Sequence, residues 1–193
     1  MNEAVSIGSL WLPIVVSAVI VFVASSIVWM VLPHHRNDWV KLPDEEGIMA
    51  AMRKAGVQPG QYAFPNCAGD MKELKNPAYM AKLNQGPVGF LMVAPNGAKH
   101  MGSALGQWFV YTLVIGVFVA YVTGRVLKPG SEYLSVFRVA GTVAILCYTC
   151  ALIPNSIWKS YAWSKTFKEI VDGAVYGLLT AGTFAAFWPS AGA

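Results

Sequence analysis

The chain has 193 residues, of which 55% are hydrophobic and 12% charged, with a formal net charge of +4 and a pI near 9.0. Soluble domains carry roughly 25% charged residues, so this composition excludes an ordinary soluble domain. The basic residues are scattered among acidic ones and beside apolar stretches, so they do not indicate nucleic-acid binding. The sequence also contains no phosphate-binding glycine loop, GxSxG or HExxH motif, which removes several common enzyme classes.

Four strongly apolar stretches dominate the sequence. Each is long enough, at about 1.5 Å per residue, to cross roughly 30 Å of hydrocarbon as a helix. They predict an all-α integral membrane protein with four transmembrane helices, a single membrane domain over residues 1–193. The tail before the first stretch has no lysine or arginine, so we expect a retained span and not a signal peptide. The stretches are residues 10–32, 104–127, 134–154 and 170–189.

The distribution of lysine and arginine predicts the orientation of these spans. With four spans, residues 33–103 and 155–169 lie on one side, and the short turn at 128–133 lies on the other with both termini. More basic residues flank the first pair of segments than flank the turn, and neither terminal tail contains one. The positive-inside rule therefore places residues 33–103 in the cytoplasm and both termini outside an inner (plasma) membrane.

Residues 33–103 form a polar insert, which we expect to fold as a small mixed α/β extramembrane cap between the first two spans. Asp44, followed by two glutamates, predicts a capped short helix, and Asn76 before proline predicts another helical turn. Residues 62–64 and 87–94 read as extended pieces. Because large apolar residues are few, we expect this cap to need the membrane helices or a partner for stability.

Small residues recur at four-residue spacing on the second and fourth stretches. At this spacing they let helix backbones approach closely in lipid. Packing within one chain explains them, and dimerisation or docking on another subunit is the alternative. The residues are Gly116, Ala120, Gly124, Gly173 and Gly177.

The cysteines form a candidate redox set. Cys147 and Cys150 make a CxxC in the third stretch, where helical spacing puts both sulfurs on nearly one face, and Cys67 lies in the insert. A thiol with a lowered pKa is a good nucleophile for disulfide exchange, and a third cysteine resolves a mixed disulfide. The alternative is that Cys147 and Cys150 are small apolar residues of a packed helix.

The histidines form a candidate metal set. His34 and His35 follow the first stretch and His100 precedes the second, so the insert that joins these ends places all three at one membrane surface. With Asp38 they offer the ligands that zinc or iron prefers, while nearby methionines favour copper, so the cofactor stays open. The alternative is an interfacial collar that contacts lipid headgroups.

Two charged residues lie inside the apolar stretches. Arg138 and Asp172 are each about one turn from an end, shallow enough to snorkel or to bond a neighbouring loop. No charge lies near the midplane, which disfavours a standalone transporter.

These patterns support two hypotheses about function. The first is a non-catalytic accessory or assembly subunit of a larger membrane complex, with the lipid bilayer and other membrane subunits or a second copy as partners. Small-residue helix faces, aromatic interfaces and the core-poor cap motivate it. The second is a membrane thiol or metal redox protein that uses the three cysteines and the juxtamembrane histidines.

Overall fold

The computed structural model describes residues 4–97 and 100–191 and is mostly helical. The chain divides into two compact units. The helical unit consists of Met1–Asp38, His100–Pro154 and Ala162–Ala193, and the smaller unit consists of Trp39–Lys99 and Asn155–Tyr161.

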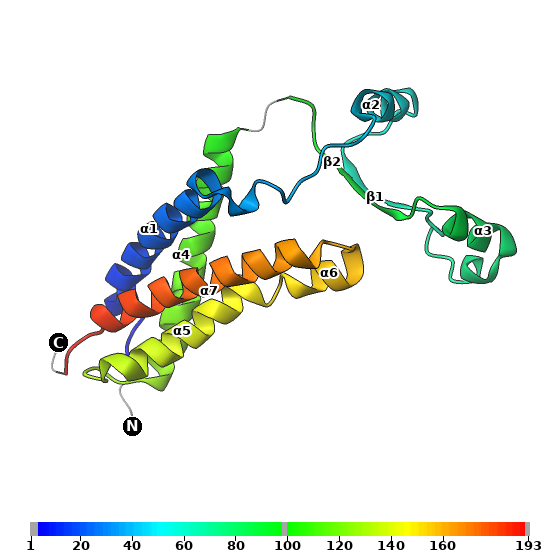
Figure 1. Cartoon of the computed structure of the whole chain (residues 1–193). Coiled ribbons are helices and arrows are strands. Elements are labelled where there is room, and N and C mark those ends of the chain that lie inside the picture. The colour runs from blue at the N-terminus through cyan, green and yellow to red at the C-terminus, as the bar shows by residue number, and fades with distance from the viewer. Residues whose placement is uncertain (1–3, 98–99, 192–193) are drawn as a thin grey trace. The chain divides into compact units, whose positions relative to one another are not determined.

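Four long helices build the helical unit (Figure 1). They are α1 (Trp11–Ser26), α4 (Met101–Val126), α5 (Tyr133–Thr149) and α7 (Trp163–Ala186), and the short helix α6 (Ile153–Lys159) follows α5. Three helical runs in the described chain are long and apolar enough to cross a membrane, namely Gly8–Val31, Met101–Val126 and Tyr133–Lys159. They coincide with the first three apolar stretches of the sequence.

Backbone hydrogen bonds join one end of the helical unit. The amide of Val5, ahead of α1, donates to the carbonyl of Gly124 near the end of α4 at 3.0 Å. The amide of Gly130, just before α5, donates to the carbonyl of Pro189 after α7 at 2.8 Å. The start of α1 and the end of α4 therefore meet, as do the start of α5 and the end of α7, so each pair runs antiparallel.

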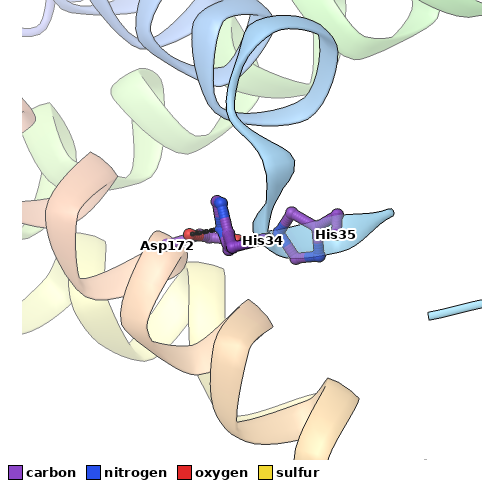
Figure 2. A group of neighbouring side chains, drawn as sticks. All are labelled: His34, His35 and Asp172. Atoms are coloured by element: carbon purple, nitrogen blue, oxygen red, sulfur yellow. Dashed lines mark hydrogen bonds and ion pairs between the residues drawn. The ribbon is translucent and has the colours of Figure 1, made fainter. Parts of the chain in front are cut away.

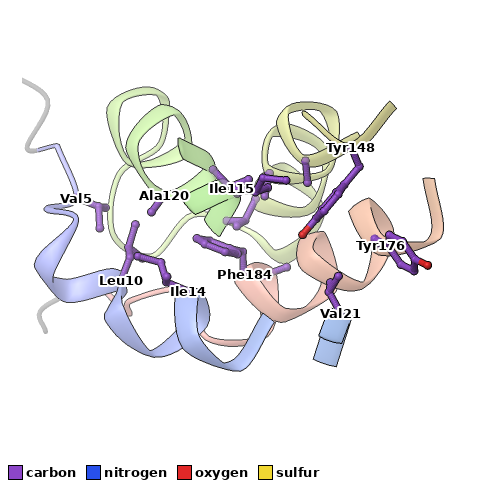
Figure 3. Packing of buried hydrophobic residues seen from close by; sticks show 14 residues of the cluster. Val5, Leu10, Ile14, Val21, Ile115, Ala120, Tyr148, Tyr176 and Phe184 are labelled. Carbon is purple, nitrogen blue, oxygen red and sulfur yellow. The ribbon is translucent and has the colours of Figure 1, made fainter. Parts of the chain in front are cut away.

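The core of the helical unit is mostly aliphatic and also contains the rings of Phe184, Tyr148 and Tyr176 (Figure 3). Leu10, Val21, Val119 and Phe184 are fully buried and come from the segments around α1, α4 and α7. In water, burial of such a side chain stabilises the folded state by roughly 1.5–3 kcal/mol. Between helices in lipid, close van der Waals packing provides the stabilisation instead.

The small residues singled out in the sequence lie where helices approach closely. A Cβ on Gly116 would lie 3.2 Å from Ile14, and one on Gly124 would lie 2.6 Å from the Val5 carbonyl oxygen. Ala120, between them on α4, is fully buried. On α7, Gly173 and Gly177 face α5 in the same way. All five residues therefore pack against helices or segments of their own chain.

The smaller unit contains a two-stranded antiparallel sheet and two short helices. Strands β1 (Gly60–Phe64) and β2 (Gly89–Val93) pair with Gly60 opposite Val93. Helix α2 (Glu45–Lys54) begins at Asp44, whose carboxylate accepts a hydrogen bond from the Gly47 amide at 3.1 Å. Helix α3 (Pro77–Gln85) begins at Asn76 in the same manner. Both predicted caps and both extended pieces are confirmed.

No residue in the described range 39–97 is buried. Trp39 and Val40 are 73% and 89% exposed, and further large apolar side chains of the sheet and helices are more than one third exposed. The segment after α5 joins this unit through Tyr161, whose hydroxyl lies 3.8 Å from the Met92 sulfur. Residues 39–97 therefore supply no buried core to this unit.

Candidate metal centre

The end of α1 presents two histidines in a defined turn. The helix continues as a π-helical turn over Ile27–Val31, and Leu32 then takes an extended conformation. The residue before a proline avoids the helical region, so Leu32-Pro33 ends the helix. Pro33 then opens a 3₁₀ turn, Pro33–His35, that carries both imidazoles.

Both imidazoles converge on one carboxylate of α7. His34 Nε2 lies 3.3 Å from Asp172 Oδ1, and His35 Nε2 lies 2.7 Å from Asp172 Oδ2 (Figure 2). One ligand atom from each of the three residues lies within 4.8 Å of the other two. We call His34, His35 and Asp172 the triad.

A second carboxylate fixes the orientation of His35. Asp38 Oδ2 lies 2.5 Å from His35 Nδ1, and its other oxygen accepts a hydrogen bond from Lys168 Nζ at 2.6 Å. Lys168 Nζ also donates to the His34 carbonyl oxygen at 2.6 Å. Since Lys168 and Asp172 are four residues apart, they share one face of α7. The Trp29 ring stacks on His35, with centroids 3.9 Å apart and an interplanar angle of 4°.

The pair His35 and Asp38 is buried and strongly coupled, with 4% and 2% of the side chains exposed. Burial opposes protonation of His35, but its hydrogen bonds to Asp38 and Asp172 raise the pKa of His35 above its ordinary value. Burial likewise opposes ionisation of Asp38, but Lys168 and His35 hold the pKa of Asp38 below its usual range. Without a bound metal, this cluster is therefore a charged hydrogen-bond network.

The same geometry has the features of a metal-binding site. Two imidazole Nε2 atoms and one carboxylate are the donor set of many zinc and non-haem iron(II) sites. Metal-ligating histidines usually donate their other ring N–H to a carboxylate, which is the role that Asp38 fills for His35. Three protein ligands also leave a coordination position open, unlike the four ligands of closed structural zinc sites.

The structure brings together three of the four residues predicted as metal ligands. His34 and His35 are in the triad, and Asp38 bonds the far nitrogen of His35. His100 lies at the N-cap of α4, is exposed, and does not belong to the triad in the described chain. Sequence reasoning did not include Asp172 in this cluster. The available signal was that an acid inside an apolar stretch must bond a neighbouring group.

The cysteines do not contribute to this cluster. All three are free thiols; Cys147 is half-buried in α5, Cys150 is exposed at the end of that helix, and Cys67 belongs to the smaller unit. No disulfide links them in the structure.

A cavity of about 570 Å³ adjoins the triad in the helical unit, and Asp172 is part of its wall. Side chains from the α1–π-helical segment, α4, α5 and α7 line it, and most of them are apolar or aromatic. Its aromatic lining residues are Trp29, Trp108, Tyr111, Tyr148 and Tyr176. The triad carboxylate therefore contacts the buried His35 and the partly exposed His34 and also forms part of the wall of a mostly apolar cavity.

Comparisons with family models, with curated proteins and with solved structures found no match for this chain.

Proposed function

We propose that this chain is a multi-pass membrane protein that binds a first-row divalent transition metal through His34, His35 and Asp172. The observation that carries the proposal is the convergence of two Nε2 atoms on one buried carboxylate, with ligand atoms within 4.8 Å of one another. The donor set favours zinc or iron(II), because methionine and thiolate sulfur are absent from the triad.

The surroundings of the triad support a reactive centre in preference to a structural one. Asp172 also lines the 570 Å³ cavity, so an open coordination position beside it would be accessible to a small molecule. A metal held there would act as a Lewis acid or, as iron, as a redox centre. The residues of this chain hold the ligands in place: Asp38 orients His35, Lys168 neutralises Asp38, and Trp29 covers the His35 ring.

Metal analysis of the purified chain tests this proposal. We expect the native protein, purified without histidine tags or chelators, to carry close to one zinc or iron atom per chain. Asp172→Asn keeps the size of the side chain but replaces the anionic ligand with a neutral amide, so it should lose most of the metal. His100→Gln, which changes an exposed histidine outside the triad, is the matched control and should keep the metal. Native protein without stoichiometric metal, or equal loss from both variants, would contradict the proposal.

We also propose that α7 is a fourth membrane span, which makes this a four-helix membrane protein. The distribution of lysine and arginine then favours a cytoplasmic location for the polar insert. In support, α7 is roughly 36 Å long at 1.5 Å per residue, and it packs along α5 through Gly173 and Gly177. Its polar first turns, with Lys165 and Glu169 paired at 3.1 Å, explain why hydropathy alone does not identify it.

A second candidate function is supported by the smaller unit. Because no described residue in 39–97 is buried, its exposed apolar side chains favour a protein partner, as in an accessory or assembly subunit of a membrane complex. Gentle detergent extraction from the native membrane, followed by mass spectrometry, tests it. A stoichiometric partner would support this role, and a stable folded monomer that co-purifies with nothing would contradict it.

A further inference from the structure

The cavity that Asp172 lines is elongated. Its α4 wall residues recur at intervals of three and four, so they share one face of that helix. From Met101 to Tyr111 this face is about 15 Å long at 1.5 Å per residue. The α4 wall residues are Met101, Ala104, Leu105, Trp108 and Tyr111. A space of this length suits a chain better than a compact molecule.

Aromatic rings close one end of the cavity. The Trp108 ring centroid lies 5.4 Å from that of Tyr111 and 6.3 Å from that of Tyr176. The Tyr148 ring centroid lies 6.3 and 5.8 Å from those of the same two tyrosines. Because the rings contact one another, they form a continuous wall with no slot between them for a flat molecule. On α4 and α7 these rings occupy the last positions of the wall, and we call this the aromatic end of the cavity.

The opposite end of the cavity is open. Met30 and Met101 line it there, and they are 68% and 63% exposed. Met30 belongs to the π-helical turn after α1, and Met101 begins α4, so both lie at the helix ends that the insert joins in the sequence. With the membrane spans proposed above, the open end therefore lies near the membrane surface, and the aromatic end lies deeper among the helices.

Polar side chains of the wall are bonded within the protein. The hydroxyls of Ser25 and Ser26 both donate to the Phe22 carbonyl, at 2.9 and 2.8 Å. The Trp108 indole N–H donates to the Ser25 hydroxyl at 2.8 Å. The Tyr176 hydroxyl is buried, so it does not reach an occupant of the cavity. The surface that these residues leave to an occupant is therefore mainly carbon.

The two carboxylates of the wall are paired as well. Asp172 is shared between His34 and His35, and Glu169 lies 3.1 Å from Lys165. A cationic ligand, such as the quaternary ammonium groups that aromatic cages bind, would have to compete with these partners. An anionic ligand would be repelled by both carboxylates. The charges of the described wall therefore favour an uncharged, apolar occupant.

We propose that the cavity holds one acyl chain of a bilayer phospholipid, with the headgroup at the open end and the chain extending to the aromatic end. A hydrocarbon chain needs no polar partner, and in a bilayer it extends inward from the headgroup, which is the direction of the cavity. The volume of about 570 Å³ is in the range of small-molecule sites. The inference rests on the membrane spans proposed above and goes beyond the metal site, because the chain passes Asp172 in the wall but needs no metal.

Native mass spectrometry of the full-length chain, purified in a mild detergent, tests the proposal. We expect the native chain to retain one phospholipid. Leu105→Trp fills the cavity from α4 and should lower the lipid-bound fraction about tenfold. Val110→Trp is the matched control, because it adds the same ring to α4 at a side chain that is 58% exposed and outside the cavity wall. Where Leu105→Trp does not fold, Ala104→Phe fills the same wall with a smaller ring.

Titration of the delipidated chain with dioleoyl phosphatidylcholine distinguishes the chain from the headgroup. We expect one lipid to bind again, and glycerophosphocholine, which has the headgroup but no acyl chain, should not compete. Three results would overturn the inference: no lipid on the native chain before or after titration, equal retention by folded Leu105→Trp and Val110→Trp, or competition by glycerophosphocholine. A retained fatty acid or isoprenoid, identified by its mass, would overturn the assignment to a phospholipid.

Metal analysis of the same samples separates this inference from the proposed metal site. Asp172→Asn should lose the metal and keep the lipid, because the amide preserves the size of the side chain in the wall. Metal without retained lipid would overturn this inference alone, and retained lipid without metal would leave it standing while the metal site fails. Recovery of the native chain in the soluble fraction of cells would contradict the membrane spans and this inference with them.

Discussion

His35 is held from three directions by neighbouring side chains. Asp38 and Asp172 bond its two ring nitrogens, and the Trp29 ring covers its face. Such complete restraint fixes both the orientation of the ring and the nitrogen that faces Asp172. Preorganisation of this kind is expected of the proposed metal site, whereas an interfacial histidine that only contacts headgroups does not need it.

Asp38→Asn should weaken metal binding without removing a ligand of the triad. The change exchanges the carboxylate that orients His35 for an amide, and the loss of such an outer partner typically costs 10–100-fold in metal affinity. Competition with a chromophoric chelator measures this affinity. Asp70→Asn is the control, because the Asp70 carboxylate accepts a hydrogen bond from the Lys72 amide in the smaller unit, outside the proposed metal site. If the two variants have the same affinity as the native chain, Asp38 does not support a metal ligand.

The sequence was sufficient to predict part of this site. His34 and His35 follow an apolar stretch directly, so their place at the end of a helix depends only on local composition. The choice of Asp172 as their partner depends on which face α7 turns toward α1. That rotation is set by packing contacts distant in the sequence, such as Gly177 against Ile145 of α5. Sequence reasoning therefore identified the imidazoles but not the carboxylate on which they converge.

Helix α7 carries glycines in two different environments, and this contrast gives a test of packing. A Cβ on Gly177 would lie 2.8 Å from the Ile145 backbone nitrogen, whereas one on Gly182 would have no neighbour closer than 3.7 Å. Gly177→Ala should therefore push α5 and α7 apart and destabilise the helical unit by about 1–3 kcal/mol. Gly182→Ala should be neutral or slightly stabilising, because alanine is the better helix former.

Thermal unfolding of both variants in the same detergent compares these effects. A lower unfolding temperature for Gly177→Ala alone supports the packing argument. Equal unfolding temperatures would show that α5 and α7 do not pack closely at Gly177.

Local sequence signals predicted the helices and strands of the smaller unit. The pairing of its two strands with each other is seen only in the structure. Asp44 and Asn76 begin helices because their side chains accept amide hydrogen bonds within three residues. The two strands were expected as extended pieces, but their partners lie about thirty residues apart, as Gly60 and Val93 show. No local pattern specifies such a contact.

At the scale of the whole molecule, the two units differ in how many of their apolar side chains are buried. The helical unit has a buried core, although many apolar side chains on the outside of its helices are exposed, as expected of surfaces that contact lipid. The smaller unit has exposed apolar side chains but no buried residue in its described range 39–97. In the membrane protein proposed above, a bilayer would cover the first kind of surface, and a protein partner or the membrane surface would cover the second.

The number of spans can be decided by labelling single cysteines on either side of α7. In a chain whose three native cysteines are changed to serine, Lys159→Cys precedes α7 and Ser190→Cys follows it. Four spans with the insert inside predict that an impermeant maleimide added to intact cells labels position 190 and not 159. Asn96→Cys in the insert should behave like position 159, and both should become reactive only after the membrane is opened. Labelling of 159 and 190 from the same side would reduce the protein to three spans, because α7 would then not cross. Labelling of 159 and 96 from outside, with 190 protected, would keep four spans but reverse the orientation that the lysines and arginines predict.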